Sequence, residues 1–223
     1  MQYVTFLRAS DPKVIGVSNG IMQVEFCDQT FLRAFRAVQY DLKQIIESKE
    51  LDTLQIRCVK QLKRAKVTDF VSFGPYLYRC EFLMSPRVAD ILRRFNTTIV
   101  RTFGVAAEEP SGDFGGYQLA VMDSLSYDMI DYQKSIFKSG NDLFGNKQYH
   151  AVADAEAYKD YLKTYLDFPE KIVLSNAFDR SLDFFIVPPS YLCISERLHA
   201  AFTDAGVTGA NISATRLPVV VGS

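Results

Sequence analysis

Three aspartates in the middle of the chain are the residues whose type and spacing best suit chemistry. Asp123, Asp128 and Asp131 could act as paired carboxylates in acid–base catalysis, or they could bind a divalent cation. Asp128 and Asp131 share a face only if their segment is helical, because residues three apart point to opposite sides of a strand. Exposed carboxylates that contact only water are the simpler interpretation of the same residues.

Two histidines, His150 and His199, are the other candidates for acid–base chemistry. Neither has a second histidine three or four residues away, as a metal-binding helix would provide, so no metal ligand is assigned and no cofactor is expected. The glycines of the segment SGDFGG lack the spacing of a phosphate-binding loop. No G-x-S-x-G nucleophile motif occurs either. By itself, the sequence indicates no catalytic site.

The cysteines and the hydropathy pattern predict a compartment. Four cysteines lie far apart with no C-x-x-C pair, which favours buried, reduced thiols over a zinc site or a disulfide framework: Cys27, Cys58, Cys80 and Cys193. The first residues do not resemble a secretory signal, and no stretch reaches the roughly 18 apolar residues that span a bilayer. We therefore expect a cytoplasmic protein that does not enter a membrane.

Charge is unevenly distributed along the 223 residues. Residues 1–101 hold 16 Lys and Arg against 10 Asp and Glu, a net charge of +6, whereas residues 102–223 hold 9 against 16, a net charge of −7. No Lys or Arg lies between Thr102 and Gln133. Such an asymmetry can mark a binding face for a charged partner, although the two halves could also neutralise each other in the fold. The short basic run Lys60–Lys66 lacks aromatic residues and a nucleic-acid-binding motif, so no nucleic acid is expected as a partner.

A sequence pattern that occurs twice marks the helices and strands that would position these residues. Residues 69–95 and 183–212 each begin with Asp-Phe, continue as an apolar run to a serine, and have an arginine two residues after that serine. The serines are Ser85 and Ser195, and either can cap the helix that follows it. Gly206 and Gly209 can end the second helix and form a turn. The pattern predicts two similar lobes, although two such helix starts can also arise by chance.

The spacing of apolar residues predicts an α+β fold with mostly antiparallel sheet and roughly three or four helices among short strands. Helices are expected at residues 28–46, after Ser85, at residues 154–166 and after Ser195. We expect a single domain over residues 1–223, with possible sub-lobes at residues 1–107 and 117–223. Tyrosines beside acids, as in the segment Leu125–Phe137, are typical of a protein-binding surface but also of a half-buried edge strand.

Two segments resemble a widespread family of bacterial immunity proteins that are encoded beside polymorphic toxins, including contact-dependent and type VI secreted effectors. The first is a D-x-x-D-x-x-x-S pattern at Asp128, Asp131 and Ser135. The second combines an S-E-R-L helix start with a G-x-T-G turn, at Ser195, Glu196, Arg197, Leu198, Gly206, Thr208 and Gly209. The likeness covers about the last hundred residues of the chain.

The resemblance implies a cytosolic inhibitor without catalytic activity or cofactor, which binds one cognate toxin domain. Toxins in such systems are often nucleases, and an acidic surface suits their basic clefts. The residues expected to contact the toxin are Glu108, Glu109, Asp113, Tyr117, Asp123, Tyr127, Asp128 and Asp131. The alternative is a small cytosolic hydrolase or nucleotide-processing enzyme that uses Asp123, Asp128 and Asp131 or the region around His150.

Overall fold

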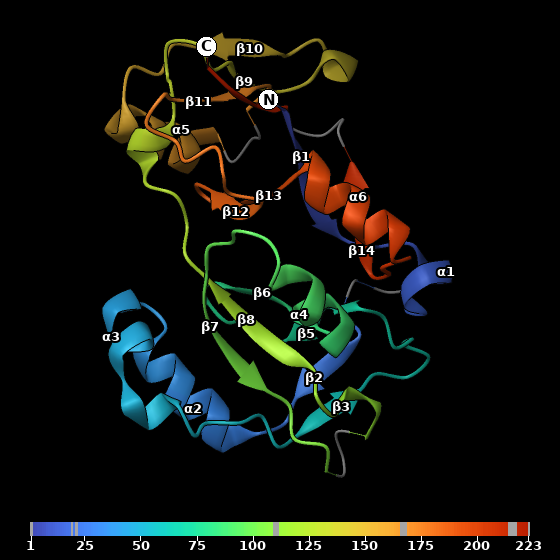
Figure 1. Cartoon of the computed structure of the whole chain (residues 1–223). Helices are drawn as coiled ribbons and strands as arrows, with labels where there is room; N and C mark the ends of the chain where they lie inside the picture. Colours follow the sequence, from blue (N-terminus) through green and yellow to red (C-terminus); the bar gives the residue numbers. More distant parts are fainter. Residues whose placement is uncertain are drawn as a thin grey trace. The chain divides into compact units, whose positions relative to one another are not determined.

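The computed structural model describes residues 2–18, 20, 22–108, 112–165, 169–213 and 218–222. The chain divides into two compact units, which are described separately below (Figure 1). Unit 1 consists of Met1–Phe6, Ser124–His199 and Ile212–Ser223, and unit 2 consists of Leu7–Asp123 and Ala200–Asn211. The fold is α+β with mostly antiparallel strand pairing, which confirms the predicted class. The described residues form six α-helices rather than three or four.

Unit 2 contains two sheets. The strands of the larger sheet follow the order β4 (Phe70–Val71), β6 (Cys80–Met84), β8 (Gln118–Met122) and β7 (Ile99–Gly104), all antiparallel. The smaller sheet has β2 (Val24–Phe26) between β3 (Val59–Gln61) and β5 (Phe73–Gly74).

The longer helices of unit 2 are amphipathic and cover these sheets. They are α2 (Gln29–Val38) and α3 (Leu42–Glu47), which pack against β7, and α4 (Pro86–Leu92), which packs against β6. The short helix α1 (Pro12–Ile15) instead buries Ile15 in a separate small cluster with Ala9, Val17 and Ala65. Phe31 and Phe35 of α2 are fully buried and contact Phe103 of β7 at ring-centroid distances of 5.4 and 5.7 Å. These aromatic contacts fix α2 against the sheet.

Unit 1 is built on a sheet in which β1 (Gln2–Arg8) from the start of the chain lies between two strands from its end. The order of the sheet is β11 (Ile172–Leu174), β15 (Val219–Val221), β1, β13 (Tyr191–Ser195) and β12 (Phe184–Val187), with β14 (Ala210–Ser213) also pairing with β1. A separate hairpin joins β9 (Phe137–Ser139) to β10 (Gln148–His150). The helix α5 (Ala155–Tyr165) places Tyr158 and Tyr161 in the core of this unit, and α6 (Glu196–Asp204) follows β13.

The helix predictions hold in position but not always in extent. The helix expected at residues 28–46 is two helices, because the chain turns at Gln39–Asp41 and Asp41 caps α3 by accepting from the Gln44 amide. Asp28 caps α2, and Asp154 accepts from the Ala157 amide at the start of α5. Residue 166, expected in that last helix, lies outside the described residues. Among the helices that the structure describes, none combines the length and the apolar character that crossing a bilayer requires.

The prediction of four reduced thiols is wrong for two of the cysteines, because Cys27 and Cys58 form a disulfide. Phe26 of β2 pairs with Val59 of β3 in the antiparallel register, so the next two residues along the ladder are the cysteines. Their Cα atoms lie 5.1 Å apart, within the range that a disulfide spans. Cys80 and Cys193 are free and buried, as expected.

Candidate functional site

The strongest polar constellation in unit 1 joins Asp183, Ser195 and Arg197, and we call it clasp 2. Asp183 precedes β12 and Ser195 ends β13, so the hairpin brings the two side chains together. The Ser195 hydroxyl donates to Asp183 Oδ1 at 2.6 Å, and Arg197 binds both carboxylate oxygens through Nε at 2.5 Å and Nη2 at 2.6 Å. The Asp183 side chain is 0% exposed, whereas that of Arg197 is 60% exposed. Clasp 2 therefore ties a buried carboxylate to the start of α6.

The same constellation occurs in unit 2 as clasp 1, formed by Asp69, Ser85 and Arg87. The Ser85 hydroxyl donates to Asp69 Oδ1 at 2.9 Å, and Arg87 again uses Nε and Nη2, at 3.1 and 2.5 Å. In both clasps the serine amide donates to the aspartate carbonyl at 2.8 Å. In both, the serine oxygen also accepts from the amide three residues later, at 3.2 Å.

The strand register around the two clasps is also the same. The residue after each aspartate pairs with the residue before each serine, Phe70 with Met84 and Phe184 with Ile194. On its other side each strand that leads to a clasp serine pairs with an antiparallel strand, which is β8 in unit 2 and β1 in unit 1. The two units thus share a hairpin-and-helix module, and the N-terminal strand completes the copy in unit 1.

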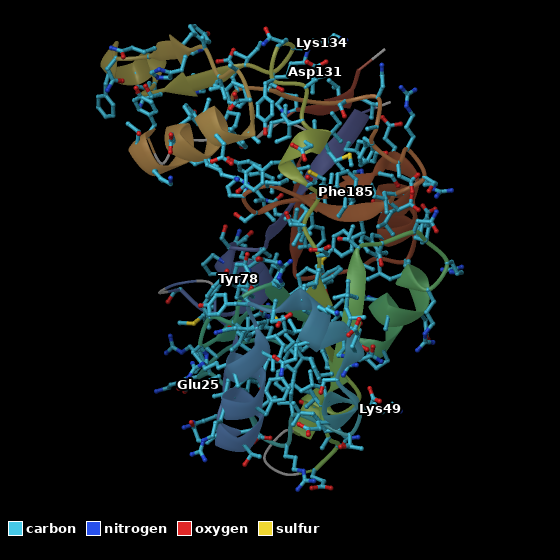
Figure 2. The ribbon with its side chains drawn as sticks, turned by 90° about the vertical axis from the view of Figure 1, so that its left-hand side faces the viewer. Glu25, Lys49, Tyr78, Asp131, Lys134 and Phe185 are labelled. Atoms are coloured by element: carbon cyan, nitrogen blue, oxygen red, sulfur yellow. A yellow bond between two sulfur atoms is a disulfide. The ribbon has the colours of Figure 1, made fainter. Side chains whose placement is uncertain are left out.

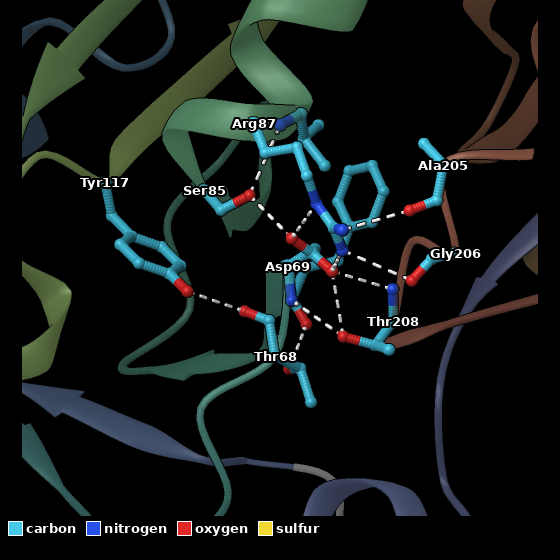
Figure 3. Close-up of polar contacts among 10 residues, drawn as sticks. Thr68, Asp69, Ser85, Arg87, Tyr117, Ala205, Gly206 and Thr208 are labelled. Carbon is cyan, nitrogen blue, oxygen red and sulfur yellow. Dashed lines mark hydrogen bonds and ion pairs between the residues drawn. The ribbon is translucent and has the colours of Figure 1, made fainter. Parts of the chain in front are cut away.

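Clasp 1 has an additional role, because it holds the segment after α6 (Figure 3). The Thr208 amide and hydroxyl both donate to Asp69 Oδ2 at 2.9 Å. Arg87 donates to the carbonyls of Ala205 and Gly206 at 2.9 and 3.2 Å, so it satisfies oxygens that the end of a helix leaves unpaired.

Gly209 allows this segment to approach closely. Its φ is +86°, and a Cβ at this position would lie 2.0 Å from the Phe70 carbonyl oxygen. The Phe70 amide in turn donates to the Thr208 carbonyl at 3.0 Å. Of the residues in the G-x-T-G pattern, Thr208 and Gly209 therefore have structural roles that the described contacts account for.

The electrostatics of clasp 1 keep its carboxylate charged. Burial by itself would raise the pKa of Asp69, but hydrogen bonds from Arg87, Thr208 and Ser85 outweigh this effect and hold the pKa below its usual value. Because the folded-state pKa is lowered, the stabilisation is present above the ordinary carboxyl pKa and is lost as the pH falls through the lowered value. The hydroxyl of Ser85 donates to Asp69 and accepts from the Val88 amide, so both of its hydrogen bonds serve to hold the fold together.

The expected toxin-binding residues of unit 2 occupy different environments. Glu108 and Asp113 are exposed, and Asp123 forms an ion pair with Arg79 at 2.7 Å. Tyr117 is only 7% exposed, and its hydroxyl donates to the Thr68 carbonyl at 3.0 Å, so its ring belongs to the core. Burial and the nearby Asp69 raise the pKa of Tyr117 to about 12. Glu109 lies outside the described residues.

In unit 1, the residues of the D-x-x-D-x-x-x-S pattern build a turn against β11. The Ser135 hydroxyl donates to the Asp131 carbonyl at 2.7 Å and accepts from the Val173 amide at 2.9 Å. The Asp131 carboxylate lies 3.5 Å from Lys134 Nζ, and Figure 2 shows the two side chains near each other. Asp128 is exposed and accepts from the Ser126 hydroxyl at 3.2 Å. Tyr127 is half-buried, with Lys159 Nζ 5.2 Å from its ring centroid.

His150 has a partner that the sequence did not indicate. Its Nε2 lies 2.7 Å from Ser139 Oγ in the β9–β10 hairpin, and its ring stacks on Tyr165 at a centroid distance of 4.1 Å. A serine and a histidine in hydrogen-bond contact are the minimal parts of a nucleophile and its base. No group of three or more His, Cys, Asp or Glu that could hold a metal ion occurs within the described part of the chain.

Sequence reasoning found the clasp serines as helix caps but missed the function of the two aspartates. The signal was present, because each Asp-Phe pair stands before a run that ends at the capping serine. A hairpin brings a residue before its first strand beside one at the end of its second, which would have placed carboxylate and hydroxyl together. Comparison with models of known protein families and with curated proteins finds no match to this chain.

Proposed function

We propose that this protein is an immunity protein that binds a cognate bacterial toxin domain and neutralises it by occluding the toxin's active site. The proposal rests on the resemblance of the C-terminal segments to such proteins, and the roles of their residues are compatible with it. Ser195, Arg197 and Thr208 are engaged in contacts that hold the fold together. Binding would then depend on exposed residues outside the two clasps.

The exposure of acidic side chains is the observation that carries the choice of surface. Glu108 and Asp113 of unit 2 are exposed and form no ion pair with any residue that the structure describes. Unpaired carboxylates can match the phosphate-binding cleft of a nuclease and accelerate its capture by electrostatic steering. A nuclease is therefore the class of toxin that we propose. We further propose that the protein acts in the cytoplasm, without catalysis and without a cofactor.

Reversing these charges is expected to slow association with the toxin. The variant carries Glu108→Lys and Asp113→Lys, and the probe is the toxin domain encoded beside this gene. We expect the association rate at low salt to fall by about tenfold or more, because steering depends on these charges. Biolayer interferometry at two salt concentrations measures both the rate and its salt dependence.

A matched variant controls for net charge. Glu47 and Glu50 are also exposed acids of unit 2, and Glu47→Lys with Glu50→Lys changes the net charge by the same amount. If both double variants slow association equally, net charge rather than the surface at Glu108 and Asp113 attracts the toxin. If the wild-type protein does not bind the toxin at all, the proposed function is rejected.

The Ser139–His150 contact supports a second candidate function, a hydrolase. An esterase assay with p-nitrophenyl acetate tests it, and from the immunity proposal we expect no hydrolysis above that of buffer. Hydrolysis that Ser139→Ala abolishes, and that Ser126→Ala leaves unchanged, would establish the second candidate instead. Asp128 and Asp131 belong to unit 1 and Asp123 to unit 2, so within either unit these three carboxylates do not form one site.

A further inference from the structure

An open groove of about 400 Å³ lies in unit 2 between α2 and the strands β2 and β5. This volume falls within the range of small-molecule pockets. Its apolar walls come from segments that are distant in sequence: Met22, Val24, Leu32, Leu62 and Pro75. Met22 is 50% exposed, and its flexible thioether can adapt to an apolar group in the groove.

Two side chains of opposite charge belong to the lining of this groove. Glu25 comes from β2 and Arg36 from α2, and both are exposed. Within the described residues neither of them forms an ion pair. Most of the other arginines of this unit are, by contrast, each paired with a carboxylate: Arg8, Arg79, Arg87, Arg93 and Arg101. The groove therefore offers a free anion and a free cation beside apolar walls.

Exposed tyrosines follow two of the segments that line the groove, α2 and Gly74–Pro75. Tyr40 follows α2 and is 74% exposed, and its ring centroid lies 5.1 Å from that of Tyr78. The Tyr78 amide donates to the side chain of Gln39 at 3.0 Å, which fixes the loop after Pro75 to the end of α2. Tyr76, next to Pro75, is 66% exposed. Figure 2 shows Glu25 and Tyr78 on the same side of the unit.

We propose that this surface binds an extended segment of the toxin, with an aromatic or leucine side chain in the groove, an acidic residue against Arg36 and a basic residue against Glu25. Tyrosine and arginine are enriched at the centres of protein interfaces, where rigid aromatic rings supply contact area. The phosphates of a nucleic acid could pair with Arg36 but would be repelled by Glu25, whereas a peptide can supply a partner for both charges. This inference rests on the proposed function, because it takes the toxin as the partner.

Affinity for the neighbouring-gene toxin domain tests the groove. Tyr40→Ala with Tyr78→Ala removes the exposed aromatic pair, and Arg36→Glu reverses the cation. We expect each change to raise the dissociation constant by about tenfold or more. Tyr149→Ala is the matched control, since Tyr149 is 62% exposed and belongs to unit 1, and it should leave the affinity unchanged. Circular dichroism of each variant verifies that it is folded.

The outcomes separate this inference from the proposed function. If wild-type protein binds the toxin and the variant with Glu108→Lys and Asp113→Lys weakens binding while the groove variants do not, the groove inference is rejected and the function stands. If wild-type protein fails to bind the toxin, both are rejected. Binding of a fluorescein-labelled oligothymidylate that Arg36→Glu abolishes would reject the peptide in favour of a nucleic acid.

Discussion

Replacing Asp183 by alanine is expected to lower the free energy of unfolding by about 3 kcal/mol. The carboxylate is fully buried, and its loss would remove the acceptor of the Ser195 hydroxyl and of two Arg197 donors. We place the effect at the lower end of the range for buried ion pairs because the Arg197 side chain is 60% exposed and can be rehydrated. Urea unfolding followed by circular dichroism measures the change.

The exposed ion pair Asp90–Arg93 provides the matched control. Its side chains are 65% and 69% exposed, so Asp90→Ala should change the stability by less than about 0.5 kcal/mol. If Asp183→Ala costs no more than Asp90→Ala, clasp 2 does not stabilise the fold. A double-mutant cycle of Asp183→Ala and Arg197→Ala then isolates the pair itself, and a coupling energy near zero would also contradict the prediction.

The two clasps argue for a repeated module more strongly than the sequence pattern does. Two capped helices can occur by chance, but here each cap is joined to an aspartate by the same hydrogen bonds and within the same strand register. Asp69 stands 16 residues before its serine and Asp183 stands 12 before its own. The hairpin loops therefore differ in length while the clasps at their ends agree.

Local signals were sufficient for much of the fold. The caps at Asp28, Ser85 and Ser195 could be predicted because a side-chain oxygen before an amphipathic stretch satisfies first-turn amides. The break before α3 was not predictable from hydrophobic spacing, because buried positions recur at helical intervals on both sides of it, at Val38 and Ile45. The spacing of apolar residues shows which face of a helical segment is buried, but it does not show whether the segment is one continuous helix or two.

Contacts that depend on strand register were beyond the sequence pattern. The Cys27–Cys58 disulfide joins residues that are 31 apart, and only the alignment of β2 with β3 reveals their proximity. The groove lined by Glu25 and Arg36 likewise needs four segments to meet. Tyr117 shows the opposite case, since proximity to acids in the sequence suggested an exposed ring and the fold buries it.

Removing the Cys27–Cys58 disulfide is expected to lower the free energy of unfolding by about 3 to 4 kcal/mol. The bond links residues 31 apart, and opening a loop of that length increases the conformational entropy of the unfolded chain. The variant is Cys27→Ser with Cys58→Ser, because both residues are partly exposed and serine there creates no apolar cavity. Urea unfolding without reductant compares the variant with the wild-type protein.

Thiol counting with Ellman's reagent tests the bond independently. Burial raises the pKa of the Cys80 thiol and that of the Cys193 thiol, so both should be unreactive in the folded protein. After denaturation without reductant we expect two reactive thiols, and after reduction all four cysteines should react. Four reactive thiols in unreduced, denatured protein would show that the pair is not bonded.

The double-serine variant also controls for reductant. Dithiothreitol should lower the stability of the wild-type protein to that of the variant, and it should leave the variant unchanged. Disulfides persist mainly in oxidising compartments, so the thiol count of protein alkylated inside the producing cell bears directly on the proposed cytoplasmic location. If Cys27 and Cys58 are bonded in freshly alkylated protein, the cytoplasmic location is contradicted. If they are free, the bond forms only after the protein has left the cytoplasm.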